Sequence, residues 1–102
     1  MFDYFYYKGN EYQSKDTPAQ VMTKYELRDD NTLWREDSDA EWIETPGEFL
    51  GGYIKETNHR WVFCEHFLGE IRFYRSIDRA RDEWEEYSAY FKNGILREIN
   101  EV

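Results

Sequence analysis

Four carboxylates in the middle of the chain have the spacing of a calcium-binding loop. Asp37, Asp39 and Glu41 would fill loop places 1, 3 and 5, and Glu48 would fill place 12. Place 6 of such a loop needs glycine for a sharp turn, and this chain has Trp42 there. Calcium binding is therefore kept as an alternative, and we expect no metal site.

Cys64 and His66, with His59 nearby, are the other residues that could do chemistry. Two residues apart on a strand, Cys64 and His66 would point the same way and could bind a metal or form a nucleophile pair. A structural zinc site needs four ligands, however, and a thiol on an apolar strand is usually inert. Known catalytic and phosphate-binding motifs are missing from the sequence. We therefore expect no catalytic residue and no cofactor.

The strongest chemical signal is a local concentration of acids. The chain carries 22 Asp and Glu against 13 Lys and Arg, for a net charge of −9. Segment 29–48 holds eight of these acids and one base, Arg35, so most of the net charge lies there. A local acidic field attracts basic surfaces, and large flat side chains beside it can anchor a partner.

We therefore expect this segment to bind a basic protein, one that could itself bind nucleic acid. The predicted contact residues combine carboxylates with two tryptophans: Asp29, Asp30, Trp34, Glu36, Asp37, Asp39, Glu41, Trp42 and Glu44. If 36–44 is a strand, acids two residues apart, such as Asp37, Asp39 and Glu41, lie about 6.5–7 Å apart, a row that could imitate a nucleic-acid backbone. The function predicted in this way is a small acidic binding or inhibitor protein of the immunity, antitoxin or anti-defence type.

Other interpretations of the same residues stay open. Acidic runs often do no more than keep a hairpin solvated. A small β-barrel could also hold a cationic group in a cage of Trp and Tyr rings with acids at its rim. An uncharacterised enzyme is a further alternative, which needs a cleft that holds a carboxylate or histidine with a shifted pKa.

Composition limits the class of protein. At 102 residues we expect a single domain, 1–102, with a core built from aromatic side chains, which make up 20% of the chain. A lone cysteine, Cys64, and the lack of a signal-like start or a long apolar run predict a cytoplasmic protein. The negative net charge argues against direct binding of nucleic acid or membrane. A homodimer stays open, because so many aromatics in a small domain could leave some exposed.

Turn residues recur between aromatic-rich segments and predict an antiparallel meander. The four candidate hairpins are centred on Gly9-Asn10, Asp30-Asn31, Asn58 and Asn93-Gly94. Many hairpins leave many strand edges, and rolling up the sheet removes them. We therefore expect a mainly β (or α+β) fold, rolled or barrel-like, with at most one or two helices.

Segment 77–92 fits two structures. A helical stripe is formed by Ile77, Ala80, Trp84, Tyr87 and Phe91, with Ser76 as a candidate N-cap. A strand is favoured near the end, where aromatic residues alternate into the Asn93-Gly94 turn. The pattern leaves both structures open, and we lean to a strand for 84–92.

Overall fold

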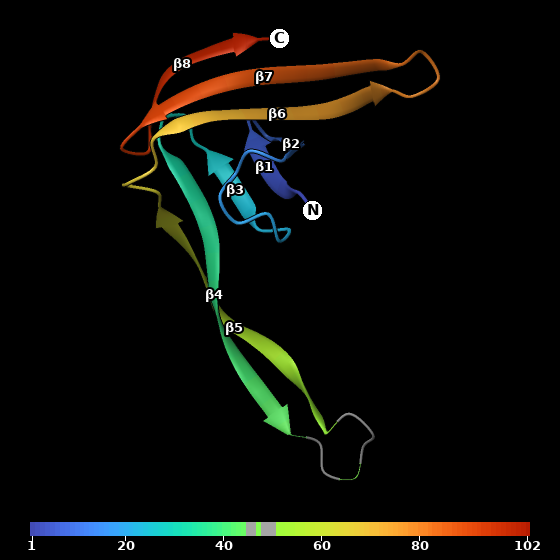
Figure 1. The fold of residues 1–102 in the computed structure, drawn as a ribbon, viewed down its shortest axis with the longest axis vertical. Helices are drawn as coiled ribbons and strands as arrows, with labels where there is room; N and C mark the ends of the chain where they lie inside the picture. The colour runs from blue at the N-terminus through green and yellow to red at the C-terminus, as the bar shows by residue number, and fades with distance from the viewer. Residues whose placement is uncertain (45–46, 48–50) are drawn as a thin grey trace.

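In a computed structural model, residues 1–44, 47 and 51–102 are described. Eight strands follow one another along the chain: β1 (Asp3–Tyr7), β2 (Asn10–Ser14), β3 (Lys24–Leu27), β4 (Leu33–Glu44), β5 (Gly52–Phe63), β6 (Gly69–Asp78), β7 (Glu83–Lys92) and β8 (Ile95–Glu101). They form one sheet in the order β5-β4-β3-β1-β2-β6-β7-β8 (Figure 1), and no helix occurs within the described residues. The sheet curls into a half-barrel, so the predicted mainly β, rolled architecture is confirmed.

Three of the four predicted hairpins form. The β1–β2 turn is Lys8-Gly9, one residue earlier than predicted, and the β7–β8 turn is Asn93-Gly94. Both turns have positive φ at their two central residues, at 49° and 77° in the first and 53° and 72° in the second. This is the backbone of a type I′ turn, whose twist matches that of the strands it joins. The β3–β4 turn contains Asn31, also at positive φ.

The hairpin predicted at Asn58 is wrong. β5 runs without a break through this position, and Asn58 lies where the pairing with β4 shifts between Asp37 and Asp39. Asn58 has φ of 55°, which asparagine tolerates better than most residues. Its left-handed conformation therefore serves a β-bulge inside a strand instead of a chain reversal.

The helix considered for 77–92 is also wrong, and the strand favoured for 84–92 is confirmed. β6 continues to Asp78, the chain turns through 79–82, and β7 begins at Glu83. Ala89 and Phe91 both have no exposed surface and alternate with exposed residues along β7. Pairing with β6 and burial of this face decide the structure, which a helical stripe in the sequence could not reveal.

The sheet departs from a simple meander at its centre. β1 and β3 pair in parallel, with Tyr4 opposite Lys24 and Tyr7 opposite Leu27. The connection between β2 and β3 is tied down by the buried carboxylate of Asp3. This carboxylate accepts hydrogen bonds of 2.6–2.9 Å from the Thr17 hydroxyl and from the backbone N–H groups of Gln20, Val21 and Thr23. The connection is therefore held against β1, which lets β3 enter the sheet alongside it.

The concave face of the sheet carries the core. Its fully or almost fully buried apolar residues are Phe5, Tyr12, Tyr25, Leu27, Leu33, Ile71, Phe73, Ala89 and Phe91. Phe5 of β1 stacks on Phe73 of β6 with ring centroids 4.2 Å apart. Backbone hydrogen bonds close one end of the curl, where Leu33 donates to the Gly94 carbonyl and Leu96 donates to the Asn31 carbonyl, both at 2.8 Å.

A long arm extends from this body. β3 pairs with β4 as far as Arg35, and in the described residues β4 pairs with β5 alone from Glu36 onward. Figure 1 shows β4 and β5 running together away from the other strands. The radius of gyration is 16.8 Å, against about 13 Å for a compact chain of this length. We call residues 36–44 and 52–61 the β4–β5 arm.

Candidate partner-binding surface

On one face of the β4–β5 arm, a single arginine forms ion pairs with two of the predicted acids. Arg60 of β5 contacts Asp37 with Nη2 at 3.1 Å and Asp39 with Nη1 at 3.3 Å. Asn58 also donates from Nδ2 to Asp39 at 3.0 Å. The hydrogen bond from Asn58, followed by that from Arg60, lowers the pKa of the Asp39 carboxyl. The two acids are therefore held in place, and their charge is balanced by Arg60 together with Arg35, whose Nη1 lies 3.8 Å from Asp37.

The β-bulge explains how one arginine reaches both acids. Thr57 lies opposite Asp39 and Arg60 lies opposite Asp37, so β5 has two residues where β4 has only Ser38. A bulge of this kind re-aims the side chains beside it. The local insertion in β5 therefore brings Asn58 and Arg60 onto the carboxylates.

The opposite face of the hairpin is aromatic. Trp34 lies directly across from Phe63 with ring centroids 5.5 Å apart, and Glu36 lies directly across from Trp61. The carboxylate of Glu36 accepts a hydrogen bond from Nδ1 of His59 at 3.0 Å. Trp61 keeps 37% of its surface exposed, although it borders the body of the sheet.

An arginine of the same chain lies on these rings. The Arg28 guanidinium is 4.1 Å from the centre of the Trp34 ring and 5.9 Å from that of Trp61. Its Nε donates to Oε1 of Glu26 at 2.6 Å. Trp34 donates from Nε1 to the Thr32 hydroxyl at 2.7 Å, which fixes the orientation of its ring. We call Glu26, Arg28, Trp34, Trp61 and Phe63 the tryptophan face.

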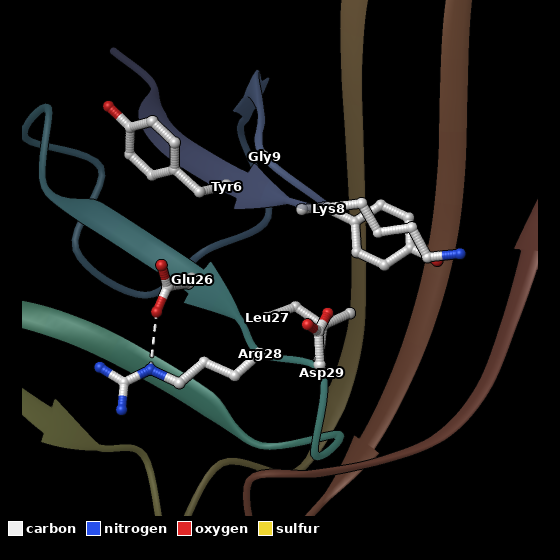
Figure 2. A pocket seen from close by; sticks show the side chains of 8 residues that line it. Tyr6, Lys8, Gly9, Glu26, Leu27, Arg28 and Asp29 are labelled. Carbon is white, nitrogen blue, oxygen red and sulfur yellow. Dashed lines mark hydrogen bonds and ion pairs between the residues drawn. The ribbon is translucent and has the colours of Figure 1, made fainter.

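A cleft opens beside this face, at the carboxyl ends of the parallel strands β1 and β3. Its volume is about 730 Å³, and it is lined by Tyr6, Tyr7, Lys8, Gly9, Glu26, Leu27, Arg28 and Asp29. Figure 2 shows Arg28 reaching back to Glu26 on the same side of the strands as Tyr6. The Tyr6 hydroxyl donates to Glu11 at 2.8 Å, and burial together with this bond raises the pKa of Tyr6 to about 12. The cleft thus combines aromatic walls with groups of both charges.

The predicted contact residues fall into three places. Asp29 and Asp30 lie in the exposed β3–β4 turn, where a hydrogen bond from the Thr32 hydroxyl lowers the pKa of Asp30. Trp34 and Glu36 lie on the aromatic side of the hairpin. The remaining acids of the described surface, Asp37, Asp39 and Glu41, follow along the arm. Trp42 and Glu44 belong to β4, but their side chains lie outside the described residues.

Sequence reasoning missed several members of this surface. Trp61, Phe63 and Arg60 all come from β5 and reach the predicted residues only through the β4–β5 pairing. A hairpin register that placed Glu36 opposite Trp61 would have found them.

The residues considered for metal binding do not assemble into a site. Asp37, Asp39 and Glu41 lie on an extended strand instead of a loop, so the calcium-loop alternative is wrong for this part, and Glu48 lies outside the described residues. Among the residues that the structure describes, no group of three or more His, Cys, Asp and Glu could hold a metal ion.

The prediction that Cys64 and His66 point the same way from one strand is wrong. β5 ends at Phe63, Cys64 is half-buried against the core, and His66 lies in a turn with 92% of its side chain exposed. Burial raises the pKa of the Cys64 thiol, which disfavours the reactive thiolate. The contact of His66 is with Glu65, at 3.4 Å.

The site and fold together define an open, curled all-β protein with an acidic arm and a partly exposed aromatic face. Comparisons with family models, curated proteins and solved structures find no match to this chain. Within the described ranges, no helix is long and apolar enough to cross a membrane. Function is therefore inferred from the surface residues themselves.

Proposed function

We propose that this protein is a small cytoplasmic binding protein of the immunity, antitoxin or anti-defence type, which inhibits a basic protein. One observation carries the proposal: acids of β4 project on a two-stranded arm, and partly exposed aromatic rings lie where the arm leaves the body of the sheet. Carboxylates on an arm can enter a basic groove, and the rings beside them can be buried on contact. Aromatic anchors supply most of the affinity in such interfaces, while charges supply speed and specificity.

The charge of the arm supports a basic partner. Asp37 and Asp39 share the guanidinium of Arg60, and Asp37 also lies 3.8 Å from that of Arg35, so these four groups balance one another. The negative charge of the arm comes from its other carboxylates, because residues 36–44 and 52–61 carry six acids against two Lys and Arg. Glu41 adds a further carboxylate to the same strand. The whole chain has a net charge of −9, and a field of this sign steers encounter with a positively charged surface.

A comparison of two charge reversals in pull-down experiments from the native host tests the proposal. The wild-type protein should retain a basic protein at low ionic strength and release it at high ionic strength, because salt screens exposed charges. The double variant Asp37→Lys/Asp39→Lys should retain much less, through slower association. The variant Glu98→Lys/Glu101→Lys on β8 changes the net charge equally and should behave like wild type.

Two results would contradict the proposal: no basic protein is retained by the wild-type chain, or both double variants lose it equally. Because lysine beside Arg60 could disturb the arm, Asp37→Asn/Asp39→Asn provides a milder form of the test. Circular dichroism of each variant checks that the sheet is intact.

A second candidate function is a module that binds a small cationic ligand. The contact of the Arg28 guanidinium with Trp34, beside a cleft of about 730 Å³, favours it. Such a module should show quenching of tryptophan fluorescence by a small quaternary ammonium ion, because cations bind the faces of aromatic rings. Tryptophan fluorescence that stays unchanged up to high concentrations of the ammonium ion would exclude this second function.

A further inference from the structure

The tryptophan face already holds a guanidinium in a recognisable geometry. Arg28 lies 4.1 Å from the centre of the Trp34 ring while its Nε is bonded to Glu26 at 2.6 Å. A flat aromatic surface and a carboxylate at its edge are the two groups that arginine prefers as partners. The face therefore suits a guanidinium group, and the side chain of Arg28 occupies it in this structure.

Arg28 is held there weakly enough to be replaced. Its side chain and that of Glu26 are 35% and 37% exposed, and ion pairs at such exposure contribute little to stability. The contact between a cation and an aromatic ring is likewise modest at an exposed site. An arginine of the partner would make the same two interactions that Arg28 loses. The free energy of this exchange is therefore close to zero before any other contact is counted.

The backbone of Arg28 is anchored independently of its side chain. Its N–H donates to the Thr32 carbonyl and its own carbonyl accepts from Asn31 N–H, both at 2.9 Å. These bonds close the β3–β4 turn. The side chain can therefore leave Trp34 without opening the turn that positions the ring.

We infer that the tryptophan face is a binding site for an arginine side chain of the basic partner, and that Arg28 is its resident placeholder. This inference rests on the proposed function and names the chemistry of the partner at this surface. The neighbouring Glu36, opposite Trp61, and the acids of the arm attract the positive charge that brings the arginine in. Lysine fits the face less well, because its compact ammonium group cannot stack as a plane or bind a carboxylate in a fork.

Titration with a tri-arginine peptide, followed through the indole N–H signals in NMR spectra, tests this inference. Single Trp→Phe variants assign the four signals. In the wild-type protein the Trp34 signal should shift, and a tri-lysine peptide should shift it less. Removing the placeholder with Arg28→Ala should tighten tri-arginine binding about five-fold, the size expected for one exposed cation–π contact.

The variant Arg97→Ala on β8 removes the same charge elsewhere and is the matched control. It should not tighten binding selectively at Trp34. If Arg28→Ala and Arg97→Ala act alike, or if arginine and lysine peptides respond alike, the inference is overturned, because only net charge would matter. If Arg28→Ala proves unstable, Arg28→Gln keeps a hydrogen-bond donor for Glu26 while removing the guanidinium, and the same tightening is expected.

This result is separable from that of the proposed function. Peptide binding at Trp34 can be measured whether or not a host protein is captured. A captured partner whose binding is unaffected by Trp34→Leu would overturn the arginine site and leave the acidic arm as the docking surface.

Discussion

Gly94 lies directly against the backbone of Cys64. A Cβ atom at Gly94 would lie 2.8 Å from the carbonyl carbon of Cys64 and closer still to its carbonyl oxygen. Gly94 N–H also donates to the Phe67 carbonyl at 2.9 Å, and the Gly94 carbonyl accepts from Leu33. The β7–β8 turn, the start of β4 and the β5–β6 connection therefore meet at a residue without a side chain.

Gly94→Ala should destabilise the protein by more than the conformational cost alone. Its φ of 72° already disfavours alanine by about 1–2 kcal/mol, and the contact with Cys64 involves backbone that cannot easily move. Urea unfolding measures the loss. Gly9→Ala is a matched control, since Gly9 has φ of 77° and open space around its Cβ position. Equal losses in the two variants would show that the contact with Cys64 is not tight.

Phe73→Ala should remove about 3–5 kcal/mol of the free energy of unfolding, because its ring is fully buried and stacks on Phe5. Domains of this size are stable by about 5–15 kcal/mol, so this loss is a large share of the total and should lower the unfolding temperature. Thermal unfolding followed by circular dichroism tests this. Trp84→Ala, at a ring that is 70% exposed, should change stability by less than about 0.5 kcal/mol. A small effect at Phe73 would contradict the assignment of the concave face as the core.

The stability of the sheet should depend on pH through Glu85. Hydrogen bonds from Tyr87 and then Arg75 hold the pKa of Glu85 below its usual 4.5. Its stabilising contribution is therefore complete above about pH 4.5 and is lost as the pH falls through the lower folded-state value. The same bond to Glu85, followed by burial, raises the pKa of Tyr87 from 10.0 to about 12. That contribution is complete below pH 10 and is lost as the pH rises towards 12.

In a plot of the unfolding midpoint against pH, Glu85→Gln should therefore make both the acid and the alkaline limbs less steep than in wild type. Glu98→Gln on β8 removes the same charge and should leave both limbs as they are in wild type. Limbs as steep in Glu85→Gln as in wild type would contradict the role given to the Glu85 hydrogen bonds.

Asn58→Gly should raise the pKa of Asp39 towards its usual 3.8, because it removes the largest cause of the lowered value. Glycine tolerates the φ of 55° at this position, so the β-bulge should be kept. A carboxyl-carbon NMR titration measures the change. The same substitution at Asn93, which also has positive φ but lies in the β7–β8 turn, should leave the Asp39 titration unchanged. An unaltered Asp39 pKa in Asn58→Gly would show that Arg60 alone holds the carboxylate.

Much of the fold could be predicted from short patterns. Alternating aromatic residues predict a strand for 84–92, and Ala89 and Phe91 are fully buried there on β7. The Asn93-Gly94 pair was expected to make a hairpin turn, and it does. These predictions succeeded because alternation and turn chemistry act over a few residues.

Asn58 shows where such patterns fail. Asparagine at positive φ serves a turn or a β-bulge equally well, and only the partner strand decides between them. The helix considered for 77–92 failed for a related reason. Its apolar residues fit both the period of a helix and the alternation of a strand, and pairing with β6 selected the strand.

The sequence alone determined the alternating strands, most turns and the concentration of acids in 29–48. Only the tertiary structure decided the parallel β1–β3 pair, Arg60 between Asp37 and Asp39, and Arg28 over Trp34. Strand periodicity is a property of neighbouring residues. Pairing and cross-strand contacts instead depend on which distant strands bury their faces together, so the chemistry of the surface emerges only when the sheet is assembled.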